Sequence, residues 1–132
     1  MKYLLLLLFF IFPNHEKSEK KDEVKCIAVY KLGFGMQVPV DINCDNFLER
    51  RPDSFFISDK HWCNRVVNEI NASTPVPEYN GIDTRAKLFI KYKSGHIDTV
   101  CIGETVICSY NNKMMELRSR YLKKILDSLG KK

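Results

Sequence analysis

The sequence predicts an α+β fold, in which a mostly antiparallel sheet of five or six strands carries two main helices on one side. Short segments rich in β-branched and aromatic residues alternate with turn residues, most clearly in RAKLFIKYKSGHIDTVCIGETVICSY, residues 85–110. Two other segments, near residues 60–70 and 112–129, repeat apolar residues at the spacing of a helix buried on one face. Residues 23–132 are long enough to form one domain with a hydrophobic core.

The first 22 residues are predicted to stand outside this domain. An uninterrupted apolar or aromatic run, Tyr3 to Phe12, follows Lys2, and as a helix it would cover only about half of a ~30 Å hydrocarbon core. A positive residue, a short apolar stretch and then a polar chain are typical of a secretory signal. No pair of small residues marks a cleavage site, so cleavage stays open, as does the alternative that residues 4–12 form a buried element. The charged stretch from His15 reads as a linker.

The first strand is expected at Val24 to Leu32, and it is expected to form a hairpin with Met36 to Ile42. Pro39 lacks a backbone donor and therefore places the second strand at an edge of the sheet. The loop decides whether Cys26 and Cys44 face each other. A loop of residues 34–36 sets them directly opposite and permits a disulfide, whereas a loop of residues 33–35 does not.

The chain has five cysteines, and no two have the CxxC spacing of a zinc site or a thioredoxin-like redox motif. The odd count leaves at least one free thiol. Cys101 and Cys108 are expected on the same sheet face but diagonally placed, too far apart for a disulfide, and therefore packed as small apolar residues.

The segment from residue 44 to 83 is expected to alternate between short elements and loops. Asn46 with Glu49 predicts a short helical turn that Pro52 ends, and Phe55 to Ile57 predicts a brief strand. Ser58 or Asp59 then caps a helix, because the apolar residues that follow lie on one broad face: Trp62, Cys63, Val66, Val67 and Ile70. Residues 72–83 read as a loop.

Residues 85–110 predict a three-stranded meander. Ser94-Gly95 fits a two-residue hairpin loop that pairs Lys91 with Asp98, and Gly103-Glu104 fits a second such turn. In this register one face is nearly all apolar and is assigned to the core. Its members are Ala86, Leu88, Ile90, Tyr92, Ile97, Thr99, Cys101, Val106, Cys108 and Tyr110.

The last helix is predicted from about Asn112 to Leu129, with half of its circumference apolar and packed on the meander. Arg118 falls within the apolar arc. Its long aliphatic stem favours a position at the margin, with the guanidinium extended to solvent.

The opposite face of the meander carries the predicted binding site. Apolar residues should cluster at its centre with lysines around them, a pattern found at interaction sites. The predicted site residues are Lys87, Phe89, Lys91, Lys93, His96, Val100, Ile102 and Ile107. Alternatively, the first hairpin or the helix of Trp62 covers this cluster and makes it a second small core. An exposed cluster would favour a protein partner with an acidic rim over nucleic acid, because it offers one aromatic ring for stacking and Asp98 interrupts the positive field.

No catalytic, metal-binding or cofactor motif is found. The three histidines, at 15, 61 and 96, form no metal-ligand pair, and His61 and Cys63 point to different sides of their helix. The sequence has no P-loop, dinucleotide fingerprint or G-x-S-x-G turn. We therefore predict no cofactor and no metal.

The sequence thus predicts a small exported module that binds or inhibits a protein partner, located in the periplasm, the cell envelope or the extracellular space. Basic and acidic residues are interspersed and the net charge is only +5, which disfavours nucleic acid. Two alternatives stay open: an exported enzyme with scattered active-site residues, and an envelope protein held by an uncleaved N-terminal segment. Membrane contact is expected only through residues 3–12.

Overall fold

The computed structural model of the chain describes residues 22–35, 41–77 and 81–131. The signal-like segment, most of the linker and Pro39 lie outside the described residues. The elements in chain order are β1 (Val24–Lys31), η1 (Phe47–Arg50), β2 (Asp53–Ile57), α1 (Lys60–Asn71), β3 (Thr74–Pro75), β4 (Thr84–Tyr92), β5 (Ile97–Gly103), β6 (Ile107–Tyr110), β7 (Lys113–Glu116) and α2 (Tyr121–Leu129).

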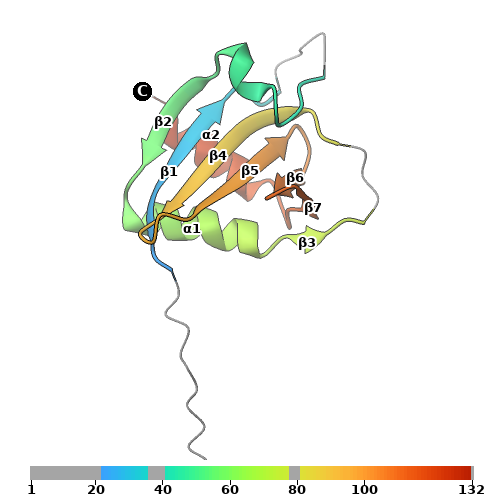
Figure 1. Cartoon of the computed structure of the whole chain (residues 1–132). Coiled ribbons are helices and arrows are strands. Elements are labelled where there is room, and N and C mark those ends of the chain that lie inside the picture. Colours follow the sequence, from blue (N-terminus) through green and yellow to red (C-terminus); the bar gives the residue numbers. More distant parts are fainter. Residues whose placement is uncertain (1–21, 36–40, 78–80, 132) are drawn as a thin grey trace, which may run out of the picture.

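These strands form one antiparallel sheet in the order β2-β1-β4-β5-β6-β7-β3. Helices α1 and α2 both lie on the same side of it, behind the sheet in Figure 1, while only the short helix η1 lies over the near side at its upper end. The α+β class and the strand meander followed by a helix are confirmed. The described sheet has seven strands, because β7 and β3, which were not predicted, extend it beyond β6.

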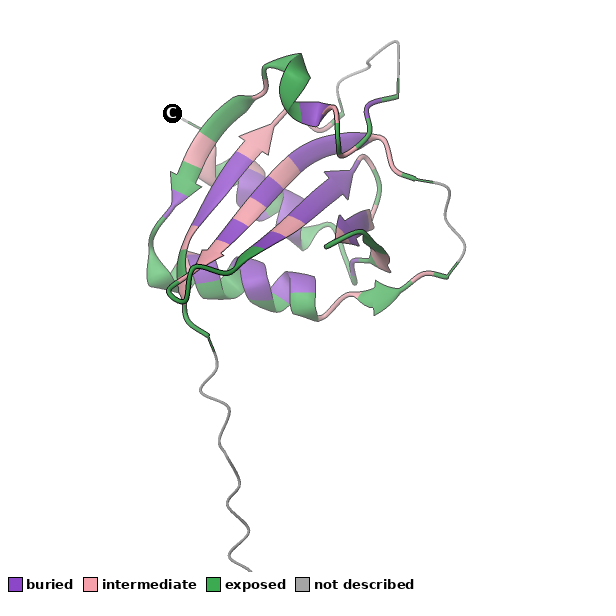
Figure 2. Ribbon diagram, viewed as in Figure 1, coloured by how far each residue is buried: buried purple, intermediate pink, exposed green. Residues whose placement is uncertain are grey.

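The core lies between the sheet and the two helices. Alternate residues of β1, β4 and β5 are buried against the apolar faces of α1 and α2, and Figure 2 shows buried residues concentrated on these strands. Fully burying one such Leu, Ile or Val side chain stabilises the fold by about 1.5–3 kcal/mol. Members of this core with no exposed surface are Ile27, Val29, Val66, Ala86, Leu88, Val100, Ile102, Cys108, Leu122 and Leu126.

The expected first hairpin is wrong. Strand β1 pairs with β2 on one side and with β4 on the other, so neither of its edges is free for Met36 to Ile42. Residue Ile42 is buried but belongs to no strand, and residues 36–40 lie outside the described part of the chain. A central strand gains hydrogen bonds along both edges, which a two-stranded hairpin cannot supply.

The β4–β5 hairpin differs from the expected register by one residue. Lys91 pairs with Ile97 and Leu88 pairs with Val100, because the loop has three residues and Gly95 takes a left-handed φ of 92°. A three-residue loop with glycine at its left-handed position is a common hairpin connection. Since side chains alternate between faces, this one-residue shift turns every side chain of β5 to the opposite side of the sheet.

The end of the meander also differs. Val100 pairs with Tyr110, three residues away from the expected register of β5 and β6. Asn111 and Asn112 then adopt φ values of 45° and 66°, the pair of left-handed residues that a tight type I′ hairpin turn requires. This turn starts β7, so Met114 and Met115 lie in a strand and the last helix begins only at Tyr121.

Other local predictions are confirmed. Helix α1 is capped by Asp59, whose Oδ1 accepts a hydrogen bond from the Trp62 backbone N–H at 3.0 Å, and its apolar face packs into the core. The short turn η1 forms after Asn46, although no side-chain capping bond forms there. Arg118 is not helical, and its exposed guanidinium donates to the buried carboxylate of Glu69.

Candidate functional site

The sheet face turned away from α1 and α2 is called the open face. Pairing in β2, β1, β4 and β5 places Phe56, Ala28, Phe89 and Thr99 in one row across it. The next row on the same face, two residues further along β4, pairs Lys91 with Ile97. The small side chain of Ala28 lies between the two phenylalanines in this row and is buried.

The open face carries exposed apolar side chains flanked by cations, from the edge strand β2 across to β5. Phe56 is 66% exposed and Ile97 is 49% exposed, and Phe89 is partly buried, edge-on against the Tyr30 ring at 5.9 Å between centroids. The Lys91 ammonium lies 5.9 Å from the Phe56 ring centroid and the Lys87 ammonium lies 5.5 Å from that of Phe89. We call Phe56, Phe89, Ile97, Lys87 and Lys91 the open-face patch.

A disulfide fixes one boundary of this patch. Cys44 is bonded to Cys101 across 57 residues of sequence, so the expected Cys26–Cys44 bridge is wrong and Cys26 is a free thiol. The register shift explains this result, because it turns Cys101 from the core to the open face. The bond holds residues 41–50 over the upper end of that face, where Phe47 is fully buried and Lys87 Nζ donates to the Cys44 carbonyl at 2.9 Å.

The structure brings together only part of the predicted site. Lys87, Phe89 and Lys91 lie on the open face as expected, but Val100 and Ile102 are fully buried in the core between sheet and helices. The remaining three lie away from the centre: Lys93 in the hairpin loop, His96 beside Asp98, and Ile107 on β6. Among the described residues neither proposed cover lies on this face, since the helix of Trp62 packs on the opposite side and both edges of β1 are paired with other strands. Phe56 could not be identified as a site residue from the sequence alone, because the local pattern does not show which of the neighbours Phe55 and Phe56 faces the core.

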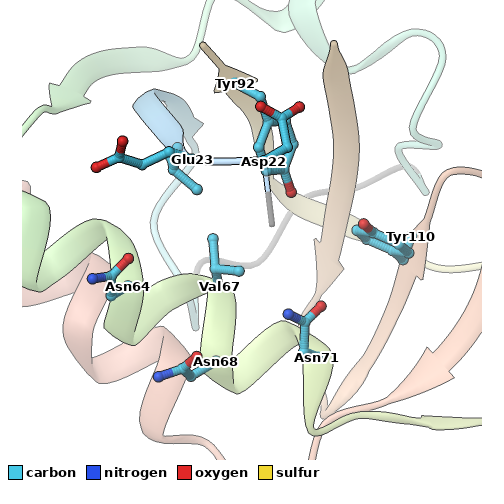
Figure 3. Close-up of a pocket in the computed structure, with 9 residues that line it drawn as sticks. Asp22, Glu23, Asn64, Val67, Asn68, Asn71, Tyr92 and Tyr110 are labelled. Atoms are coloured by element: carbon cyan, nitrogen blue, oxygen red, sulfur yellow. The ribbon is translucent and has the colours of Figure 1, made fainter. Parts of the chain in front are cut away.

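A second candidate site is a cavity of about 650 Å³ at the lower end of the sheet, on the helix side. Figure 3 shows three asparagines of α1, Asn64, Asn68 and Asn71, on one wall, with Tyr92 and Tyr110 contributed by the strands. The chain at Asp22 and Glu23 closes another side. These residues were missed because their only sequence signal is the i, i+4, i+7 spacing of three asparagines on a helix.

Asp98 lies behind the two tyrosines. Its Oδ2 accepts from the Tyr92 hydroxyl at 2.7 Å and from the Tyr110 hydroxyl at 2.5 Å, and its Oδ1 accepts from the Asn111 amide at 2.8 Å and lies 2.6 Å from His96 Nε2. Burial by itself would raise the pKa of Asp98, but these hydrogen bonds to the anion outweigh it and lower the pKa to about 2.

The pKa values of the two tyrosines shift upwards, opposite to that of Asp98. Burial, together with hydrogen bonding to Asp98, raises the pKa of Tyr110 to about 12 and raises that of Tyr92 further. Both phenols therefore carry their protons at neutral pH. Asp98 is an anion, and each of its two carboxylate oxygens lies within hydrogen-bond distance of two polar groups. This arrangement stabilises a charge and positions two rings, but offers neither a free base nor an activated nucleophile.

The two buried thiols are also unreactive. Burial raises the pKa of Cys63 and that of Cys108, the latter to about 11, so both are protonated at neutral pH. Within residues 22–35, 41–77 and 81–131, no cluster of three or more His, Cys, Asp or Glu side chains could hold a metal ion. In the same residues no helix has the length and apolar character needed to cross a membrane.

Comparison with known proteins identifies no relative. No protein-family model matches the chain, and no match is found among curated proteins or among solved structures.

Proposed function

We propose that the protein is a small exported module that binds a protein partner through the open-face patch. The observation that carries this proposal is the exposure of Phe56 on the edge strand β2, at a sheet face that carries two lysines and, among the described residues, no large helix. Exposed aromatic residues with a charged surround are enriched in protein interfaces. Exposed apolar clusters of this kind on soluble proteins commonly mark sites that bind another molecule.

The charges of the patch favour an acidic partner. Lys87 and Lys91 stand next to the rings of Phe89 and Phe56, and the patch contains no carboxylate. A partner that inserts an apolar side chain beside Phe56 and places Asp or Glu opposite the lysines would satisfy both features. The open-face patch has too few cations to track a phosphate backbone.

Export is supported by the cysteine chemistry. Disulfides persist mainly in oxidising compartments, and Cys44 is bonded to Cys101. The signal-like run at Tyr3 to Phe12 supports the same proposal. A binding role is favoured over the alternative of an exported enzyme, because the buried carboxylate and phenols beside the cavity are held in unreactive protonation states.

The proposal is tested with charge-matched variants. The chain and its Phe56→Asp and Lys91→Glu variants are immobilised, and partners are captured from the medium and envelope of the source cells and identified by mass spectrometry. Each candidate is then purified and titrated against all variants. Lys124→Glu is the control, because Lys124 is exposed on α2, on the opposite side of the sheet.

A partner should bind the original chain and Lys124→Glu with equal affinity and should lose at least tenfold in affinity for Phe56→Asp and for Lys91→Glu. Raising the salt concentration should weaken binding, since exposed charges are screened. Melting temperatures of all variants should agree closely, because the altered side chains are exposed or partly exposed. Equal binding of every captured protein to Phe56→Asp and to the original chain would refute the proposal.

A further inference from the structure

The cavity beneath the sheet has a regular polar wall. Asn64, Asn68 and Asn71 are all exposed and line the cavity. At 100° per residue their positions fall within about 60° of one another around α1. They therefore form one row along the helix, which we call the asparagine row.

The first interval of this row is close to the repeat of an extended peptide, and the second is shorter. Along the helix axis, Asn64 and Asn68 are about 6 Å apart and Asn68 and Asn71 about 4.5 Å apart. In an extended chain, peptide groups that face the same side recur about every 6.6–6.8 Å. Each asparagine offers one carbonyl oxygen and one NH₂ group, the same complementary pair that a main-chain peptide unit needs.

The other walls favour an uncharged ligand. The carboxylate of Glu23 is paired with Lys93 at 2.7 Å and with Lys60 at 3.3 Å, and Asp22 accepts a hydrogen bond from Ser94. The Tyr92 and Tyr110 hydroxyls donate to Asp98, which leaves lone pairs on their oxygens to accept further bonds. A negatively charged ligand would be repelled by the Asp22 carboxylate, and the residues that line the cavity include no Lys or Arg to pair with it.

The dimensions also suit a short peptide. A volume of about 650 Å³ lies in the range of roughly 300–1,000 Å³ that is usual for ligand sites. Val24 and Val67 supply apolar surface between the asparagine row and the tyrosines. Small apolar side chains of an extended segment could pack there while its main chain bonds to the amides.

From this geometry we propose that the cavity binds an extended, uncharged peptide segment of another protein through its main chain, with the asparagine row as the principal contact. Recognition of this kind depends on peptide N–H and C=O groups more than on side chains. The site is separate from the open-face patch, since it lies on the helix side of the sheet.

The test uses the full chain labelled with nitrogen-15 and the neutral peptide acetyl-Ser-Thr-Val-Thr-Ser-amide. Side-chain NH₂ signals of asparagine are resolved individually in amide correlation spectra. Titration with the peptide should shift the NH₂ signals of Asn64, Asn68 and Asn71. The same peptide with alternate nitrogens methylated keeps its side chains but loses main-chain donors, and should bind at least about tenfold more weakly.

The double variant Asn64→Ala/Asn68→Ala should weaken peptide binding roughly tenfold, because it removes the hydrogen bonds of two of the three side-chain amides. Alanine is a better helix former than asparagine, so α1 should be retained. Ser128→Ala, an exposed change on α2, and Phe56→Asp should both bind the peptide normally, and the latter separates this site from the open-face patch.

Three results would overturn the proposal. They are equal binding of the methylated peptide, unchanged binding by the double variant, and no shift of the three NH₂ signals up to the solubility limit of the peptide. Maltotriose serves as a probe of similar size without peptide groups. If maltotriose shifted these signals and the peptide did not, the cavity would be a saccharide site instead.

Discussion

Replacing Asp98 by asparagine should remove both a large stabilising contribution and most of the acid sensitivity of the fold. Only 6% of the Asp98 side chain is exposed, and its carboxylate receives hydrogen bonds from two tyrosines and one asparagine. An asparagine can keep the bonds from the tyrosines through Oδ1. Its NH₂ group would, however, face the NH₂ group of Asn111, and one donor would be left without an acceptor.

The magnitude follows from the pKa. The Asp98 pKa falls from 3.8 to about 2 on folding, and each unit corresponds to 1.36 kcal/mol, which gives about 2 kcal/mol. Because the folded-state pKa is depressed, this stability is fully present above pH 4 and is lost as the pH falls towards 2. Mispairing with Asn111 adds about 1 kcal/mol to the loss in the variant.

The assay is urea unfolding followed by circular dichroism at several pH values between 2.5 and 7. At pH 7, Asp98→Asn should lower the free energy of unfolding by about 2–3 kcal/mol. At pH 2.5 the charge-dependent part of this difference should shrink to about 1 kcal/mol, because the Asp98 carboxyl group of the unfolded chain is then largely protonated while that of the folded chain is still mostly ionised. Asp45→Asn, at an exposed position, is the control and should change little at either pH.

Two results would refute this reasoning. One is a variant as stable as the original chain at pH 7, which would mean that the hydrogen bonds to the anion contribute nothing net. The other is a loss of equal size at pH 2.5 and pH 7, which would assign the effect to packing and not to charge.

Three further predictions concern other parts of the molecule. Reducing the Cys44–Cys101 bond, which spans 57 residues, should lower the free energy of unfolding by about 4 kcal/mol by the chain-entropy relation. Thiol titration under denaturing conditions should find three thiols before reduction and five after it. Five thiols before reduction would contradict the bond. The raised pKa values of Tyr92 and Tyr110 should make stability fall above pH 10, since folding then favours protonated phenols, and phenolate absorbance in the native protein should show two tyrosines that titrate late. Ile102→Ala should cost about 2–5 kcal/mol and Ile97→Ala less than about 1 kcal/mol, because Ile102 is fully buried and Ile97 is half exposed; equal losses would contradict the β4–β5 register.

What the sequence determined by itself was local. The α+β class, helix α1 with its Asp59 cap, and strand β2 all follow from short-range patterns, since helix periodicity and capping involve residues three or four positions apart. Lys87, Phe89 and Lys91 of the open face could also be placed, because the residues between and beside them in β4 are all apolar and mark the core face. Turn chemistry was harder to anticipate, since Ser94-Gly95 fits loops of two or three residues equally well.

The tertiary structure decided which strands pair and in what register. β1 joins β4 across some sixty residues of sequence, and this choice depends on a shared core and not on any local signal. A single residue of register then moved Val100 and Ile102 inward and turned Cys101 towards Cys44, because side chains on a strand alternate between faces. The cavity was likewise hidden in the sequence, since its walls come from α1, from three strands and from the chain before β1, and only folding brings them together.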